Sequence, residues 1–484
     1  MEMRPAPPLH HAALLLALVA LVAGWLCFNR LGEPQAPVWD EAYYLTSTAR
    51  YHQHRTQYST HPPLGTMLIA AGDKASGRNA GADWQAIGAT KKIEAAAMPR
   101  GFDYAGPRLA PALFGTLAAV LFAALMLQLT GSAPAALLLS LLVLGDTALL
   151  VQFRSAQLDP FQLSFVLAAL LAAAAILRGQ RLGGYVLFGL FIALAALVRA
   201  NALVLGAMVP VLLWPWLKAR DWRAVAARCL AGAAGGLLAA VLVLGAWMNL
   251  STYPPDPTTP AGQQDQTFDP PDRVHVYQTG DWSLSDALNA AGSIRAYMAH
   301  DLAITPPSDA NGSHPWQWLL GQGVILYRAD RSEGRLRSIG LVPNLAAWLI
   351  SLGGVLTCLL PRRLRESPLR TALLAGWLAN MAALQWLDSQ RVLYSYHYFI
   401  PLLLGHALAA LEWQHHGLPR RPALVLGALV VGFGLLAWPL ATFRPVPDWL
   451  CQAGLARCDS SLQPRTASAI RSGTAGSSIV GGMP

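Results

Sequence analysis

The stretch Leu109–Leu129, with the sequence LAPALFGTLAAVLFAALMLQL, contains no charged residue. It is long enough to cross the hydrocarbon core of a bilayer, which is about 30 Å thick and takes about 20 helical residues. Ten more apolar runs, some slightly shorter, lie near residues 9–28, 133–152, 161–177, 183–198, 201–217, 229–249, 339–360, 371–387, 392–411 and 422–442. We therefore predict an all-α polytopic membrane protein with about eleven transmembrane helices.

The composition of the whole chain agrees with this prediction. Of its 484 residues, 54% are hydrophobic and only 13% are charged, whereas soluble domains carry about 25% charged residues. The net charge of +9 is expected to set membrane orientation, so we predict no nucleic-acid partner. The chain contains no phosphate-binding loop of the form G-x-x-x-x-G-K-[ST], which argues against a nucleotide-driven pump.

The distribution of Lys and Arg predicts which loops are cytoplasmic. If the N-terminus is cytoplasmic, alternation places the segments 178–181, 218–228, 361–370 and 415–421 on that side, and every one of them is basic. Two long polar segments, 30–107 and 250–338, then lie on the outer face. We expect one transmembrane domain over residues 1–442 with these two outer loops.

The C-terminal segment 443–484 is predicted to be an extracytoplasmic tail that is partly disordered, because its end is rich in Ser and Gly. Cys451 and Cys458 lie in this tail. They would form a small disulfide loop if the tail faces an oxidising compartment, and the sequence leaves this open.

Polar residues gather near the predicted outer ends of the apolar runs. For any one of them, a bland role at the membrane surface is as good an explanation as a functional one. The whole set lies on one side, however, and this favours a substrate path. The set comprises Asp40 and Glu41 in VWDEAYY (38–44), His61, Arg108, Asp146, Arg154, Asp159, Arg199 and the segment SYHYF (395–399).

These residue types suggest a specific chemistry. A carboxylate can act as a general base toward a hydroxyl group, and arginines can hold a phosphate with two hydrogen bonds. A base and phosphate-binding arginines at the lipid boundary fit a donor in which a sugar is linked to a lipid phosphate. The activated sugar would then arrive in the bilayer.

A series of motifs resembles the protein O-mannosyltransferase family and, more broadly, the GT-C superfamily of membrane glycosyltransferases that use polyprenyl-phosphate sugars. The resemblance runs, with gaps, from about residue 38 to 410. The motifs, in chain order, are WDEAYY, HPPLG, RLAPALFGTL, DTALLVQFRSAQLDP, HPWQWLLGQGVILYR (314–328), RSEGRLRSIGLVPNLAAW (331–348) and SYHYFIPLLLGHALA. The resemblance implies the GT-C fold.

The resemblance also implies roles for the first group of residues. Asp40 matches the catalytic acidic position and is expected to be the general base, with Glu41 beside it. Arg108 is expected to contact the donor phosphate, and Arg154 and Asp159 are expected to organise the donor pocket.

For the remaining residues the resemblance implies weaker roles. His61 matches a loop that shapes the site. His397 and Tyr398 are expected to help bind the lipid or the sugar. The acceptor side is expected to include an outer segment over the cavity with His314, Trp316 and Trp318. The preceding segment 251–272, rich in Pro and Asp, matches nothing in the family and is a candidate acceptor contact.

No cofactor is certain from the sequence. Asp40, Glu41 and His61 could bind a divalent ion, because oxygen and imidazole ligands suit several metals. Their spacing is not diagnostic, so no metal site is assigned.

The favoured function is transfer of a hexose, by resemblance mannose, from a polyprenyl phosphate to protein Ser/Thr with inversion. The expected partners are this lipid-linked sugar, the bilayer and an acceptor protein or glycolipid. An alternative is a GT-C transferase for lipid A, another glycolipid or a polysaccharide, as in aminoarabinose-transferase relatives. A lipid or sugar transporter is less favoured, because transporters often show internal repeats and broken midplane helices. We expect an integral protein of a bacterial inner membrane with an extracytoplasmic active site.

Overall fold

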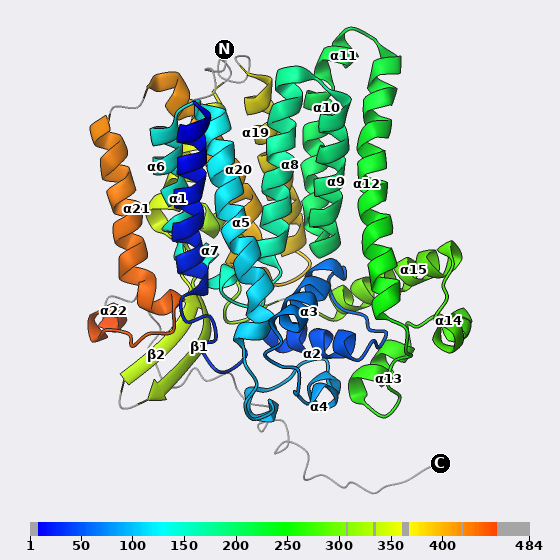
Figure 1. The fold of residues 1–484 in the computed structure, drawn as a ribbon. Coiled ribbons are helices and arrows are strands. Elements are labelled where there is room, and N and C mark those ends of the chain that lie inside the picture. The colour runs from blue at the N-terminus through cyan, green and yellow to red at the C-terminus, as the bar shows by residue number, and fades with distance from the viewer. Residues whose placement is uncertain (1–7, 306–307, 333–334, 361–366, 418–419, 453–484) are drawn as a thin grey trace, which may run out of the picture.

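The computed structural model describes residues 8–305, 308–332, 335–360, 367–417 and 420–452, and it is dominated by helices that run roughly parallel to one another (Figure 1). The long helices of the first half are α1 (Leu9–Phe28), α5 (Ala105–Thr130), α6 (Ala133–Leu144), α7 (Thr147–Phe153), α8 (Asp159–Gly179), α9 (Leu182–Val198) and α12 (Trp222–Leu250). Those of the second half are α17 (Leu345–Cys358), α19 (Pro368–Asp388), α20 (Phe399–His416) and α21 (Arg420–Ala441).

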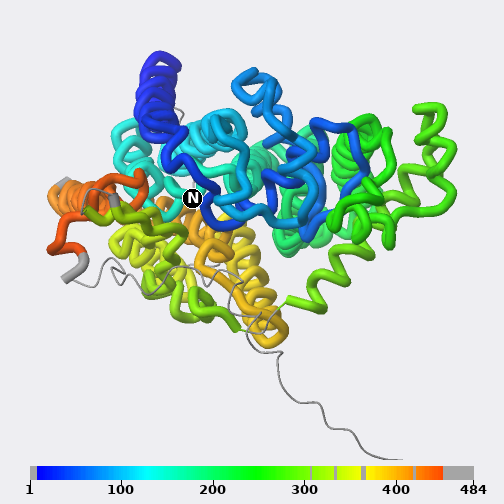
Figure 2. The backbone as a smooth tube through the Cα atoms, turned by 90° about the horizontal axis from the view of Figure 1, so that it is seen from below, coloured from blue at the N-terminus to red at the C-terminus, as the bar shows by residue number. Residues whose placement is uncertain are grey.

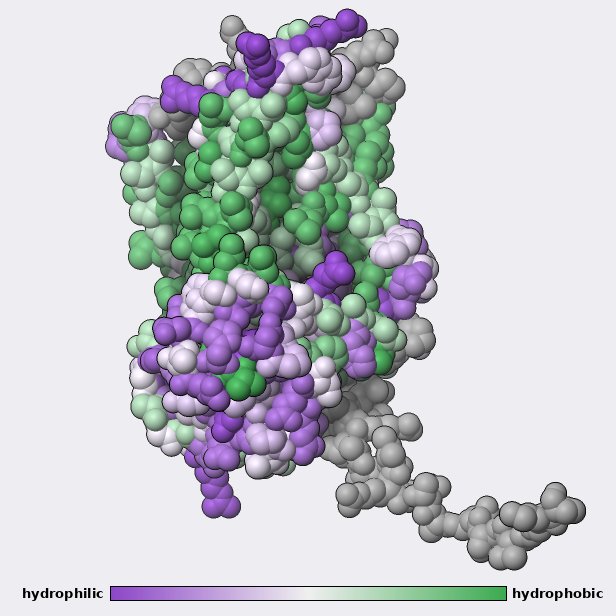
Figure 3. Space-filling model, turned by 90° about the vertical axis from the view of Figure 1, so that its right-hand side faces the viewer, coloured by the Kyte–Doolittle hydropathy of each residue, from purple (hydrophilic) through white to green (hydrophobic). Residues whose placement is uncertain are grey.

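On the face shown in Figure 3, apolar surface covers the middle of the bundle and polar surface covers its lower end. Five helices in the described part of the chain are long and apolar enough to cross a membrane: α1, α5, α8, α12 and α21. The bent pair α6 and α7 would make six. The protein is therefore an integral membrane protein, although the predicted number of eleven spans is not confirmed.

Two of the predicted spans are broken by local sequence signals. The run 133–152 bends by 71° between α6 and α7, where Asp146 caps α7 by accepting a hydrogen bond from the backbone N–H of Ala148. The run 201–217 is divided into η2 (Ala200–Met208), α10 (Val209–Leu212) and α11 (Trp214–Lys218). Pro210 and Pro215 lie in the first turns of α10 and α11, positions that Pro favours.

Close packing of α9 against α12 depends on glycine. A Cβ atom at Gly189 would lie 2.0 Å from the carbonyl oxygen of Gly232, and one at Gly235 would lie 2.0 Å from that of Val186. Any larger residue would therefore push these helices apart, as expected for small residues at membrane helix interfaces.

Both long polar segments lie at one end of the bundle, opposite the described basic segments 178–181 and 218–228 (Figure 1). The first segment forms α2 (Glu41–His52), α3 (Leu64–Ser76), α4 (Trp84–Gly88) and η1 (Ala95–Ala97). The second forms α13 (Pro260–Gln266), η3 (Pro271–Arg273), α14 (Val274–Thr279), α15 (Leu284–Ile304), α16 (Pro315–Trp318) and a hairpin of β1 (Ile325–Ser332) and β2 (Arg335–Leu341). The hairpin was not predicted.

The two polar segments pack against each other, and Figure 2 shows them side by side in blue and green. Lys91 forms an ion pair with Asp265, whose Oδ1 also accepts a hydrogen bond from the backbone N–H of Tyr58 at 2.9 Å. Arg55 and Asp256 form a second ion pair at 3.3 Å. The Pro/Asp-rich segment 251–272 therefore holds the first outer segment in place, and its contact with an acceptor stays a prediction.

The first residues of the predicted tail pack against the rest of the protein. The backbone N–H of Val446 donates to the carbonyl oxygen of Leu336 in β2 at 2.8 Å, and Val446 and Leu450 pack in a small apolar cluster with Val342. The short helix α22 (Asp448–Gln452) ends the described part of the chain. The Ser- and Gly-rich end of the tail, for which disorder is predicted, and Cys458 of the possible Cys451–Cys458 bond lie outside this part.

Candidate active site

Asp40 lies at the N-cap position of α2, directly after a residue with an unusual backbone conformation. Trp39 has φ of 49°, in the left-handed region that bulky residues rarely adopt. Its ring stacks on Tyr327 from β1 at 5.2 Å and meets Tyr394 edge-on at 5.2 Å. These two aromatic contacts hold the strained residue in place and so fix the direction in which Asp40 is presented.

The carboxylate of Asp40 is half-buried, and no group in the described part of the chain hydrogen-bonds to it. Desolvation raises its pKa to about 6, although Arg199 acts in the opposite direction; Asp159 adds to the rise. A free carboxylate with a raised pKa is suited to accept a proton near neutral pH.

Glu41, the neighbouring carboxylate, is in the opposite situation. It is fully buried and accepts four hydrogen bonds. Two come from Nε and Nη2 of Arg108, both at 2.8 Å, and two come from the backbone N–H groups of Val38 at 2.9 Å and Ala156 at 2.6 Å. Its two oxygens are therefore occupied by protein donors, and Glu41 joins three segments of the chain.

Arg108 is saturated in the same way. Beyond its two bonds to Glu41, it donates to the carbonyl oxygens of Leu31 at 3.3 Å, Pro34 at 3.0 Å and Ala36 at 3.0 Å. These five bonds use all five N–H groups of a guanidinium. The prediction that Arg108 contacts the donor phosphate therefore does not fit this structure, because no donor group is left for a phosphate.

Arg154 also binds protein backbone. Its Nη1 donates to the carbonyl oxygens of Leu26 at 2.6 Å and Cys27 at 3.2 Å, and its Nη2 donates to that of Arg30 at 3.4 Å. Arg154 thus neutralises the carbonyl end of α1, where a cation is favourable. These bonds hold the segment that leads from α1 toward Asp40. The predicted role of Arg154 was different, namely to organise the donor pocket.

Among the arginines, Arg199 has the largest electrostatic effect on the pKa of Asp40. It forms a two-point ion pair with Asp159, with Nη1–Oδ1 at 3.3 Å and Nη2–Oδ2 at 3.2 Å. Its guanidinium lies 5.2 Å from the ring centre of Tyr396. The sequence signal for Arg199 was its interruption of the apolar region 183–217, but that signal did not distinguish a functional residue from a structural one.

Further basic residues surround Asp40. The positive charges of Lys92 and Arg391 lower the pKa of Asp40. Neither residue was identified in the sequence analysis. Desolvation lowers the pKa of His61 and that of His397, the latter to about 3, and Arg199 and Arg391 lower both further. Both imidazoles are therefore neutral at physiological pH, and they lie within an electropositive surrounding that suits an anion.

Comparisons with known proteins show what the sequence and the fold are similar to. Residues 15–252 match the family model described as dolichyl-phosphate-mannose-protein mannosyltransferase. The fold is that of the S. cerevisiae protein O-mannosyltransferase Pmt1-Pmt2 complex bound to the sugar donor, with a TM-score of 0.70 and 13% identity, covering 91% of each chain. The chain has the GT-C fold and resembles the protein O-mannosyltransferases over residues 15–252.

The sequence relatives of this chain are larger proteins. It is 26% identical over 181 residues to Protein O-mannosyl-transferase 2 of Danio rerio, an alignment covering 37% of this chain and 23% of the relative. It is 33% identical over 154 residues to Protein O-mannosyltransferase 1 of Drosophila pseudoobscura pseudoobscura, covering 32% and 16%. The chain therefore spans less than a quarter of the length of these curated relatives.

Four further predicted residues, Tyr398 at the lipid or sugar side and His314, Trp316 and Trp318 at the acceptor side, differ in their exposure. Tyr398 is fully buried in the hydrophobic core. Trp318 is buried beside it and donates from Nε1 to the hydroxyl of Ser313 at 2.8 Å. Trp316 is exposed, and His314 is largely exposed and contacts Asp388 at 2.9 Å. Within α16, Trp316 is thus exposed whereas Trp318 is buried.

The possible metal site is not supported. Among the described residues, no group of three or more His, Cys, Asp or Glu side chains could hold a metal ion. Glu41 is also occupied by Arg108, so Asp40, Glu41 and His61 do not form a ligand set.

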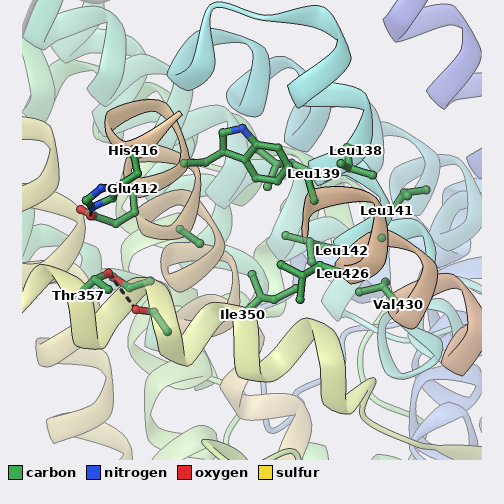
Figure 4. A pocket seen from close by; sticks show the side chains of 16 residues that line it. Leu138, Leu139, Leu141, Leu142, Ile350, Thr357, Glu412, His416, Leu426 and Val430 are labelled. Carbon is green, nitrogen blue, oxygen red and sulfur yellow. Dashed lines mark hydrogen bonds and ion pairs between the residues drawn. The ribbon is translucent and has the colours of Figure 1, made fainter. Parts of the chain in front are cut away.

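An apolar cavity of about 370 Å³ lies between α6, α17, α20 and α21, away from Asp40. Figure 4 shows Glu412, His416 and Thr357 at one side of it and leucines at the other. None of the residues that surround Asp40 lines this cavity, so it is not the candidate active site.

Proposed function

We propose that this protein transfers a hexose, most simply mannose, from a polyprenyl-phosphate donor to a Ser or Thr hydroxyl of a protein, with inversion. The observation that carries the proposal is the free carboxylate of Asp40, with its raised pKa, beside Arg199 in a GT-C fold. The matched family model and the relatives named as protein O-mannosyltransferases support both the sugar and the acceptor.

In the proposed reaction, Asp40 takes the proton of the acceptor hydroxyl. The hydroxyl oxygen then attacks the anomeric carbon of the sugar on the face opposite the phosphate. The bond between that carbon and the phosphate oxygen breaks, and its electron pair leaves with the lipid phosphate. Attack from the opposite face inverts the anomeric configuration.

Arg199 and Arg391 are the proposed partners of the departing phosphate, because they carry the positive charge that acts on Asp40. Fixed cations at the position where charge develops lower the barrier. Asp159 orients Arg199 through its two-point contact. Glu41, Arg108 and Arg154 are proposed to be positioning residues that hold the chain around Asp40.

The active site is proposed to face the extracytoplasmic side. Asp40 lies at the end of the bundle opposite the basic segments 178–181 and 218–228, and basic loops are typically cytoplasmic. The relatives reported above come from fish, fly and yeast, so a location in a bacterial inner membrane stays a prediction.

The proposal is tested with the purified full chain in lipid nanodiscs. We expect a Ser/Thr-containing peptide incubated with polyprenyl-phosphate mannose to gain the mass of one hexose, and NMR of the product should show the inverted anomer. Transfer only to a glycolipid acceptor, or a product with retained configuration, would contradict it.

Replacing Arg199 with Ala is expected to raise the KM for the donor and to lower kcat about 10²-fold, because one phosphate-stabilising group is lost. Steady-state kinetics per folded protein measure this effect. Since the single change leaves Asp159 buried and unpaired, the control is the double variant Arg199→Gln/Asp159→Asn, which replaces the ion pair by a neutral amide pair. Full donor use by this double variant would show that Arg199 is structural.

The acceptor kcat/KM is expected to depend on pH through Asp40. The base form is deprotonated, and the pKa of Asp40 is about 6, so activity should be constant above this value and fall with unit slope as the pH drops below it. Rates measured from pH 4.5 to 8, with melting temperatures as the control for folding, test this. A rate that stays constant down to pH 5 would exclude Asp40 as the base.

A further inference from the structure

The hairpin of β1 and β2 begins beside Asp40. Tyr327 of β1 stacks on Trp39, the residue before Asp40. The two strands are antiparallel, with Ala329 opposite Ser338 and Arg331 opposite Leu336. A bulge between Leu326 and Arg328 lies at the site end, and the strand runs from there toward the molecular surface.

The outer edge of β2 is covered. The backbone N–H of Val446 donates to the carbonyl oxygen of Leu336 at 2.8 Å, and Arg337 forms an antiparallel bridge with Pro445. The peptide groups of alternate residues point to opposite edges of a strand. Those of Leu336 and Ser338 therefore point away from β1.

The register then determines which groups of β1 face the other way. The residues opposite Leu336 and Ser338 are Arg331 and Ala329. In an antiparallel pair, opposed residues either both bond across the pair or both point outward. The backbone N–H and C=O groups of Ala329 and Arg331 therefore lie on the outer edge of β1. No backbone or side-chain group in the described part of the chain bonds to them.

We propose that the acceptor polypeptide binds as an added strand on this edge of β1, along Ala329 and Arg331. This inference rests on the proposed transfer to protein Ser/Thr. Unpaired strand edges are templates for a further extended chain, and the alternating donors and acceptors match a peptide backbone rather than a lipid or a sugar. At about 3.3 Å per residue, Ala329 lies about 7 Å along the strand from Tyr327.

Strand addition explains two requirements of the reaction. Backbone hydrogen bonds do not depend on side chains, so they would hold the peptide while leaving the Ser or Thr side chain free to react. An extended chain also directs alternate side chains to one face. Beside β1, a peptide continuing past Tyr327 would reach the Trp39–Asp40 segment, where the base needs its hydroxyl.

The test uses an eight-residue Thr peptide carrying single backbone N-methyl groups, with the wild-type full chain. N-methylation at alternate positions on one side of the Thr is expected to raise the peptide KM about 10-fold, and methylation at the positions between them is expected to have a smaller effect. The matched variants Ala329→Pro and Arg331→Pro remove outward N–H groups without removing a bond to β2. They should raise the ratio of the peptide KM to the KM of N-acetyl-threonine amide, which is too short to pair.

The outcomes separate this inference from the proposed function. If the wild type glycosylates neither acceptor, the proposed function fails and this inference with it. If it glycosylates both, but N-methylation shows no alternation and the proline variants leave the KM ratio unchanged, strand addition is wrong while the proposed function stands. An equal loss with both acceptors would also contradict strand addition.

Discussion

Asp40→Asn is expected to lower kcat by about 10²–10⁴-fold, the range supplied by a general base, while leaving donor binding intact. Asn has nearly the same shape but accepts no proton at neutral pH. The measurement is single-turnover transfer from labelled polyprenyl-phosphate sugar, together with donor affinity from equilibrium binding. Asp40 is expected to show this separation because its carboxylate has no protein partner to lose.

Stability provides the control for this variant. The pKa of Asp40 rises from 3.8 to about 6 on folding. A carboxyl group with a higher pKa in the folded protein stabilises the fold only while it is protonated, and this contribution is lost as the pH rises from 3.8 through about 6. At pH 7 the ionised group therefore disfavours folding, and Asp40→Asn should melt at the same or a higher temperature. Unchanged transfer by a well-folded Asp40→Asn protein would exclude its role as the base.

Glu41→Ala is expected to destabilise the fold by about 3–5 kcal/mol, the usual cost of breaking one half of a buried ion pair. Arg108 would keep a buried charge without its partner, and the backbone N–H groups of Val38 and Ala156 would lose their acceptor. Arg108→Ala should cost a similar amount, because Glu41 would then be unpaired. Thermal unfolding of the purified proteins and the yield of monodisperse protein measure both effects.

A double-mutant cycle separates this positioning role from phosphate binding. The double variant Glu41→Gln/Arg108→Gln removes both charges. Its decrease in the free energy of unfolding should therefore be smaller than the sum of the decreases in the two single variants. If Arg108→Ala instead remained as stable as the wild type and lost only donor use, the original prediction of a phosphate contact would be right.

Much of the architecture was predictable from single stretches of sequence. Apolar runs predicted the polytopic helical protein, and α1, α5, α8, α12 and α21 correspond to five of them. The hydropathy pattern did not predict where helices break. The chain changes direction at Asp146, for example, because this residue caps α7, and a hydropathy pattern does not show a cap. The hairpin was not predicted, because the pairing of residues 325–332 with residues 335–341 does not appear in a hydropathy pattern.

The candidate site was predictable only as a set of residue types. Asp40 and Glu41 are neighbours of the same chemical class, and the motif resemblance alone favoured Asp40. Likewise, Arg108, Arg154 and Arg199 were three arginines at similar predicted depth. Two of them bind backbone carbonyl groups, and the third faces the charge of Asp40.

By itself, the sequence determined that the chain crosses a membrane, which loops share a side, and which family its ordered motifs resemble. These properties depend on local composition and on order along the chain. Only the tertiary structure decided which carboxylate is free, which arginines are saturated and which strand edge is open. Each of those states depends on partners far away in sequence, since Glu41 meets Arg108 across 67 residues and Ala156 across 115. Whether a hydrogen-bonding group is free to bind a substrate depends on whether such neighbours already occupy it, and these neighbours come together only when the chain folds.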